Sequence, residues 1–184
     1  MRRALAAFVF ALTLAAPAVA QSSLDDYDKA RAALQAVWDG MPLTVRNVTL
    51  IEAAAPAYGS YDVHPGQSYR PGDDIHVYVE VLGYGWKDNG DGTQSELLDA
   101  DLNVLDGAGK LIGQQLGFLN ADIRSRQKQL ETYFNLSANL SSLEPGEYGL
   151  QFVLHDRAAG KSATFEVPVT LVPSDASLPS APAQ

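Results

Sequence analysis

The 184-residue sequence contains no cysteine, which removes several kinds of chemistry from consideration. No disulfide bond can hold the fold, and thiol nucleophiles, thiolate metal sites and dithiol redox motifs are excluded. A chain of this length does not depend on such a crosslink, because a domain of this size buries roughly 70% of its unfolded surface. The composition therefore predicts one domain stabilised by its hydrophobic core.

Basic residues are scarce, with 13 Lys and Arg against 22 Asp and Glu and a net charge of −9. Binding to nucleic acid or to anionic lipid depends on clusters of basic side chains. The nearest approach to a cluster is Arg124, Arg126 and Lys128, which we interpret as a solvated turn. We therefore expect no nucleic-acid partner, and we attribute the acidic surface to solubility.

Long hydrophobic runs are absent after the first twenty residues. Arg2 and Arg3, the apolar run 4–16 and the small residues Ala18 and Ala20 are typical of a secretory signal peptide. That run is shorter than the about 20 residues of a transmembrane helix. We expect residues 1–20 to be removed between Ala20 and Gln21, which gives an exported protein, periplasmic or secreted, without a transmembrane segment.

Catalytic signatures are also missing. The sequence has no G-x-S-x-G or H-E-x-x-H motif, and the three histidines His64, His76 and His155 have no metal-binding spacing. The segment KDNGDG (87–92) resembles a calcium loop in part, but Lys87 and Leu98 stand where such a loop needs oxygen ligands. A hairpin turn explains it without a metal. We expect no catalytic residue, no metal and no cofactor.

Residues 21–41 predict one N-terminal amphipathic helix. Ser23 can cap it, acidic residues occupy its first turn, and Gly40 followed by Pro42 ends it. Its apolar residues fall on one stripe at helical spacing: Leu24, Tyr27, Leu34, Val37, Trp38 and Met41. We expect this stripe to pack on the rest of the domain.

From residue 42 to residue 172 the hydrophobic period changes to two, which is typical of antiparallel strands with one buried face. Turn sequences rich in Gly, Asn, Asp and Pro separate about seven such runs. Pro168 lacks a ladder donor, so the last strand is expected at a sheet edge. Residues 173–184 are rich in Ser, Ala and Pro and predict a disordered tail.

The segment LEPGEYGLQFVLHD (143–156) carries the most specific motif. Pro145 and Gly146, with Tyr148 at a strand start, resemble the tyrosine corner of immunoglobulin-like and fibronectin type III-like domains. This resemblance implies a mainly β fold, an antiparallel seven-strand β-sandwich in which the Tyr148 hydroxyl bonds to the backbone upstream. The segments YRPGDDIHVYVEVLGYGW and LEPGEYGLQFVLHDRAAGKSATFEVPV also resemble exported bacterial β-domains of unassigned activity, a group that implies no functional residues.

A stripe of aromatic and polar residues is the strongest candidate for a binding surface. His76, Tyr78, Tyr84 and Trp86 alternate with the valines of one predicted strand. They could bind a protein or a sugar, lie beneath the N-terminal helix, or curl over the end of the sandwich. We expect a non-catalytic module that binds a protein of the cell envelope. A carbohydrate- or small-ligand-binding module that uses the stripe is the alternative, and a metal-dependent enzyme is the least favoured interpretation.

Overall fold

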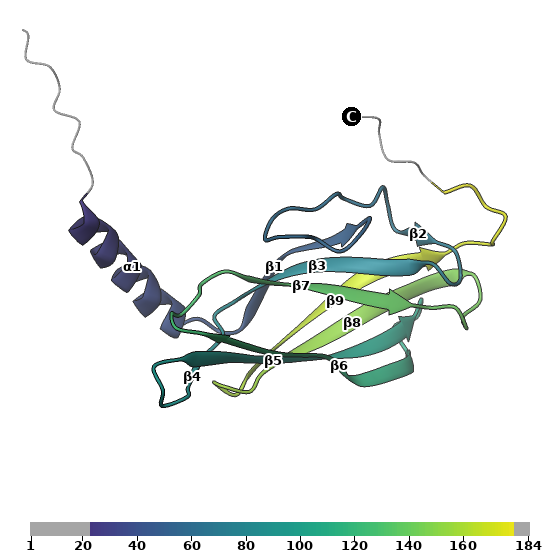
Figure 1. Cartoon of the computed structure of the whole chain (residues 1–184). Helices are drawn as coiled ribbons and strands as arrows, with labels where there is room; N and C mark the ends of the chain where they lie inside the picture. Colours follow the sequence, from purple (N-terminus) through teal and green to yellow (C-terminus); the bar gives the residue numbers. More distant parts are fainter. Residues whose placement is uncertain (1–22, 179–184) are drawn as a thin grey trace, which may run out of the picture.

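The computed structural model describes residues 23–178. These residues form one helix and nine strands, so the fold is mainly β, as the sequence predicts (Figure 1). The elements are α1 (Leu24–Asp39), β1 (Thr44–Ile51), β2 (Ser68–Tyr69), β3 (Asp74–Leu82), β4 (Lys87–Asp88), β5 (Gln94–Asp106), β6 (Leu111–Ser125), β7 (Thr132–Asn139), β8 (Gly146–Asp156) and β9 (Lys161–Leu171). The seven long strands match the seven predicted runs, and β2 and β4 are two-residue additions.

The strands form two sheets. One has the order β1-β3-β7, and the other has the order β2-β9-β8-β5-β4 with β6 paired to β5. Pairing is antiparallel throughout except between β2 and β9. In β9 the amide of Thr170 donates outward to the Gln67 carbonyl. Pro168, two residues earlier, faces the same outer side, where it interrupts no bond to β8.

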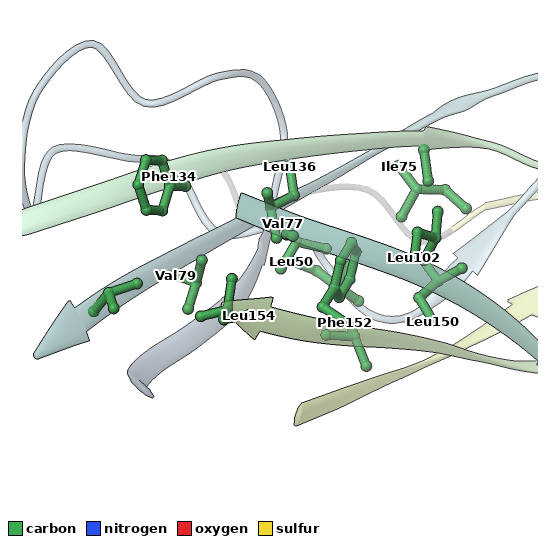
Figure 2. Close-up of a cluster of buried hydrophobic side chains, with 14 of the residues drawn as sticks. Leu50, Ile75, Val77, Val79, Leu102, Phe134, Leu136, Leu150, Phe152 and Leu154 are labelled. Atoms are coloured by element: carbon green, nitrogen blue, oxygen red, sulfur yellow. The ribbon is translucent and has the colours of Figure 1, made fainter. Parts of the chain in front are cut away.

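The hydrophobic core lies between the two sheets. Alternate side chains of β3, β5, β7 and β8 supply most of it, and Figure 2 shows the side chains of β3 and β7 directed at those of β8. Val77 and Phe152 are both fully buried. The apolar faces predicted from alternation are therefore the buried faces, and a strict period of two is what places them there.

The tyrosine corner forms as predicted. The Tyr148 hydroxyl donates a 2.8 Å hydrogen bond to the carbonyl of Glu144, four residues upstream. This bond ties the start of β8 to the loop that arrives from β7 in the other sheet. The Pro145-Gly146 pair supplies the turn between donor and acceptor.

The helix forms where the sequence places it, but its expected packing is wrong. Ser23 and Asp26 make a reciprocal capping box, and Gly40 caps the other end. Only Trp38 is buried, at the end that joins the strands. Figure 1 shows α1 extending away from both sheets, so it covers neither of them. Amphipathic spacing showed that the stripe needs a partner without showing that the partner is a sheet.

A different segment covers the outer face of the β1-β3-β7 sheet. Residues between β1 and β2 fold over it, and Ala55 and Tyr61 pack with Ile51 and Tyr78 in a second apolar cluster. This segment has no hydrophobic periodicity, which is why the sequence did not reveal its role.

The ends of the chain are described in part. The predicted signal peptide, residues 1–20, lies outside the described residues, as do residues 179–184 of the predicted tail. The part of the tail that is described contacts the body, because the Arg70 guanidinium donates to the carbonyls of Ser174 and Ala176. The one helix found in residues 23–178 is too short and too polar to cross a bilayer.

Replacing Tyr148 with Phe keeps the ring and removes the corner hydrogen bond. We expect the free energy of unfolding to fall by about 1 kcal/mol, the usual net contribution of one hydrogen bond. Urea titration measures the difference. Tyr61→Phe is the control, because the Tyr61 hydroxyl makes no hydrogen bond among the described residues. Equal stability of Tyr148→Phe and wild type would contradict a stabilising corner.

Candidate functional site

Two residues of the predicted aromatic stripe form the junction that holds α1. Trp38 packs against Tyr84 and Trp86, with ring centroids 5.0 and 5.7 Å away. The Trp38 indole N–H donates to the Tyr84 carbonyl at 2.8 Å, and Lys128 Nζ lies 5.0 Å from the centroid of the Trp86 ring. Tyr84 is 1% exposed, so its ring is unavailable to a ligand. These aromatics anchor the helix at the end of the molecule.

The other two stripe residues lie on β3, apart from that junction. Tyr78 is fully buried beneath Tyr61, whose ring centroid is 4.3 Å away, and it also stacks on Tyr133. His76 Nδ1 lies 2.7 Å from the Ser137 hydroxyl of the adjacent strand. The four predicted binding residues therefore do not form one exposed surface, since the segment after β1 covers the middle of the stripe.

A buried carboxylate network that the sequence did not reveal holds this covering segment. Glu80, 3% exposed, accepts hydrogen bonds from Arg46 Nε at 2.6 Å and from the Tyr58 hydroxyl at 2.8 Å. The Tyr78 hydroxyl donates to the other carboxylate oxygen at 3.1 Å and accepts from the Gly59 amide at 2.9 Å. The available sequence signal for this network was Glu80 itself, an acidic residue among the valines of β3.

The protonation states of this network follow from its contacts. Burial alone would raise the pKa of Glu80, but hydrogen bonds from Asn47, Tyr58, Arg46 and Tyr78 lower it below its usual value. Burial raises the pKa of Tyr78 to about 12. Glu80 is therefore an ionised acceptor held by fixed donors. That arrangement fixes the covering segment in place.

Glu96 is a second buried carboxyl, and no ion pair to it is found among the described residues. It lies on β5 at 1% exposure and accepts from the Thr132 hydroxyl at 3.1 Å. The Tyr84 hydroxyl is 3.3 Å from its other oxygen and donates to the Gln129 carbonyl at 2.8 Å. Burial raises the pKa of Glu96, and the hydrogen bonds from Thr132 and Tyr84 offset only part of the effect.

The predicted turn at residues 87–92 is confirmed. Asp91 pairs with Arg124 and also accepts from the Thr93 hydroxyl at 2.6 Å, while Asp88 accepts from the Gly90 amide at 2.8 Å. These contacts occupy the acidic side chains within the loop. Across residues 23–178 no group of three His, Asp or Glu side chains is arranged to hold a metal ion.

The open edge of β6 is the most distinctive exposed backbone feature. This 15-residue strand is the longest of the described strands, and it pairs only with β5. Several of its apolar side chains are exposed: Leu111, Ile112, Leu116 and Ile123. Its first half, 111–116, contains no charged residue, whereas Asp122 and Arg124 lie in the second half. Edge strands are ordinarily blunted by charge, and the first half has none, although its register with β5 shifts between Val104 and Leu105 and between Ala100 and Leu102.

A groove runs beside this edge. It encloses about 350 Å³ between β5 and β6 of one sheet and β7 of the other. Gln114, Gln115 and Asn139 add polar groups to its lining. Much of the lining is apolar: Leu102, Val104, Phe118, Ala138 and Leu140. A strand with one free edge beside an apolar groove can receive an extended segment, whose backbone pairs with the free edge while alternate side chains enter the groove.

Comparison with family models found no match, and neither did comparison with curated proteins. Among solved structures, a family 123 glycoside hydrolase from Clostridium perfringens matches at 10% identity and a TM-score of 0.38, over 72% of this chain and 28% of that one. The chain thus spans about a quarter of that enzyme's length. A structural genomics target, SoR45, matches at 12% identity and a TM-score of 0.33, over 78% of this chain and 96% of that one. Similarity this low carries no information about activity.

Glu96 predicts a specific pH dependence of stability. Its pKa is higher in the folded state than in the unfolded chain, so the folded state binds more protons between the two values. Stability is then lost as pH rises from about 4.3, the unfolded value, through the folded pKa. We expect Glu96→Gln to gain stability relative to wild type as pH rises.

Urea titrations of both proteins between about pH 4 and pH 8 measure this gain. The control is Glu147→Gln, because Glu147 is an exposed glutamate of β8. A difference between Glu96→Gln and wild type that stays constant with pH, or shrinks, would contradict the assigned direction of the shift.

Proposed function

We propose that the chain is a non-catalytic, exported interaction module that binds another protein by pairing an extended segment of it with β6. The observation that carries this proposal is the uncharged first half of β6, Leu111–Leu116, whose outer edge pairs with no other described strand and lies beside an apolar groove. Backbone hydrogen bonds along the edge provide affinity in such complexes, and pockets for alternate side chains provide specificity.

The edges of β9 and β1 differ from that of β6, and β7, the remaining edge of the three-stranded sheet, borders the same groove. The edge of β9 is paired to β2 at Thr170 and Leu171 and contains Pro168. The edge strand β1 is irregular, since Asn47 has a φ of 50° and the register with β3 shifts beside it. Proline and irregular register both discourage the addition of a strand. The start of β6 has neither charge nor proline and lies beside the groove, although its register with β5 shifts between Gly113 and Leu111 and between Leu119 and Gln115.

The proposal extends to an immunoglobulin- or fibronectin type III-like sandwich. The first, second and fifth long strands form one sheet, β1-β3-β7, while the third, fourth, sixth and seventh form the other. This division and the tyrosine corner at the start of the sixth long strand, β8, support that architecture. Function does not follow from it, because such domains have many unrelated roles.

A cell-envelope partner fits the predicted signal peptide and the acidic composition. The alternative, a carbohydrate- or small-ligand-binding module, has less support, because Tyr78 and Tyr84 are buried and Trp86 contacts Trp38 and Lys128. A metal-dependent enzyme has the least support, because the three histidines belong to no group of side chains, among the described residues, that could hold a metal ion. The residues that we assign to binding are instead those of the β6 edge.

Site-specific photocrosslinking in cells that export the protein tests the proposal. A benzophenone amino acid replaces Leu116, which is 69% exposed on β6. The matched control carries the same group at Thr164, an exposed position on β9. We expect one protein to be captured from position 116 and not from position 164. Adding Ile112→Lys should reduce its yield, because a lysine on an edge opposes strand addition.

No adduct at position 116, the same adducts at both positions, or an adduct only with a second copy of the chain would each contradict the proposal. Thermal unfolding of every variant confirms that the fold is intact, so that a lost adduct reports on the edge.

A further inference from the structure

The helix α1 carries an exposed apolar stripe that no described part of the body covers. Leu24, Tyr27, Leu34 and Val37 are 75%, 59%, 52% and 63% exposed. Leu24, Tyr27, Leu34 and Trp38 follow the three- and four-residue spacing of a helix that packs on another helix. A free helix of sixteen residues is marginal in water, so this stripe needs a partner.

A groove opens along the same side of the helix. It encloses about 580 Å³ between α1 and residues 127–131, the loop that joins β6 to β7. Tyr27 and Leu34 form part of one wall, and Leu130 belongs to the other. Arg31 Nη2 donates to the Lys128 carbonyl at 3.3 Å, which connects the two walls. The groove is therefore an apolar trough bounded by a helix and a loop.

The charges around the groove indicate what would fill it. Arg31 and Lys128 line it, with a single acid, Glu131. Arg126 lies two residues before Lys128 in the same turn. This local basic character contrasts with a net charge of −9 for the whole chain. The complementary occupant is an amphipathic helix with one apolar face and with acidic side chains beside that face.

The chain itself contains such a helix. The first turns of α1 combine Leu24 and Tyr27 with three acids, Asp25, Asp26 and Asp28. We propose that the groove of one copy receives α1 of a second copy, in an antiparallel, two-fold pair. The acidic start of each helix then approaches the basic loop of its partner, and the same patch is used twice, as in an isologous dimer.

The placement of α1 allows this arrangement. The helix joins the body at its Trp38 end and otherwise stands clear of the strands (Figure 1). Antiparallel pairing therefore puts the two bodies at opposite ends of the helix pair. A lipid surface is the poorer occupant, because helices that lie on membranes have basic polar faces, whereas α1 has four acids against Lys29 and Arg31.

Sedimentation equilibrium of the purified chain, as processed by the exporting cell, tests the inference. We expect twice the monomer mass at micromolar concentration. Leu34→Glu should raise the dimer dissociation constant at least about tenfold, because it places a carboxylate in an apolar contact. Leu116→Lys on β6 is the matched control and should leave dimerisation unchanged, which separates this surface from the proposed β6 interaction.

A charge exchange tests the orientation. Lys128→Glu should weaken the dimer, and the double variant Lys128→Glu/Asp28→Lys should restore it, a recovery that simple loss of folding cannot produce. A chain that is monomeric at every concentration, a dimer unaffected by Leu34→Glu, or a double variant as weak as Lys128→Glu would overturn the inference. Binding of the monomer to anionic vesicles through α1 would overturn it as well.

Discussion

The apolar contact between the inner faces of β3 and β8 is the interaction on which the rest of the molecule depends. Val77 and Phe152 lie in the middle of it and are fully buried. Full burial of an aliphatic or aromatic side chain contributes about 1.5–3 kcal/mol, and many residues contribute at once. Because each strand buries one face here, its other face is left for covering segments, solvent or partners. The outer surface therefore follows from the alternation that builds the core.

Two open sheets that face each other also leave edges, and the chain treats its edges differently. The register of β1 with β3 is irregular, as is the register of β6 with β5, and β2 together with Pro168 protects β9. The second half of β6 contains the charged residues Asp122 and Arg124, while its first half has neither charge nor proline. This uncharged free edge beside an apolar groove is the observation on which the proposed interaction rests.

Sequence patterns predicted the parts of the fold that repeat. A period of two placed the buried faces of the long strands, and one local motif predicted the hydrogen bond from Tyr148 to Glu144. The patterns failed where contacts join segments distant in sequence. Glu80 is bound by Arg46 and Tyr58, which are 34 and 22 residues away, and no spacing rule connects them. The aromatic stripe was found by alternation, but the irregular segment that covers it was not.

The helix shows a related limit. Its sequence pattern predicted the helix correctly, but the prediction that its apolar stripe packs on the rest of the domain was wrong. Amphipathic spacing reports that a face must be buried, and it contains no information about the surface that buries it. Trp38 alone enters the junction with Tyr84 and Trp86. The capping box stabilises the far end of α1 locally, yet caps contribute only about 1 kcal/mol. A helix held at one end, with its apolar side exposed, is stabilised further by whatever covers that side, so its stability and its association are coupled.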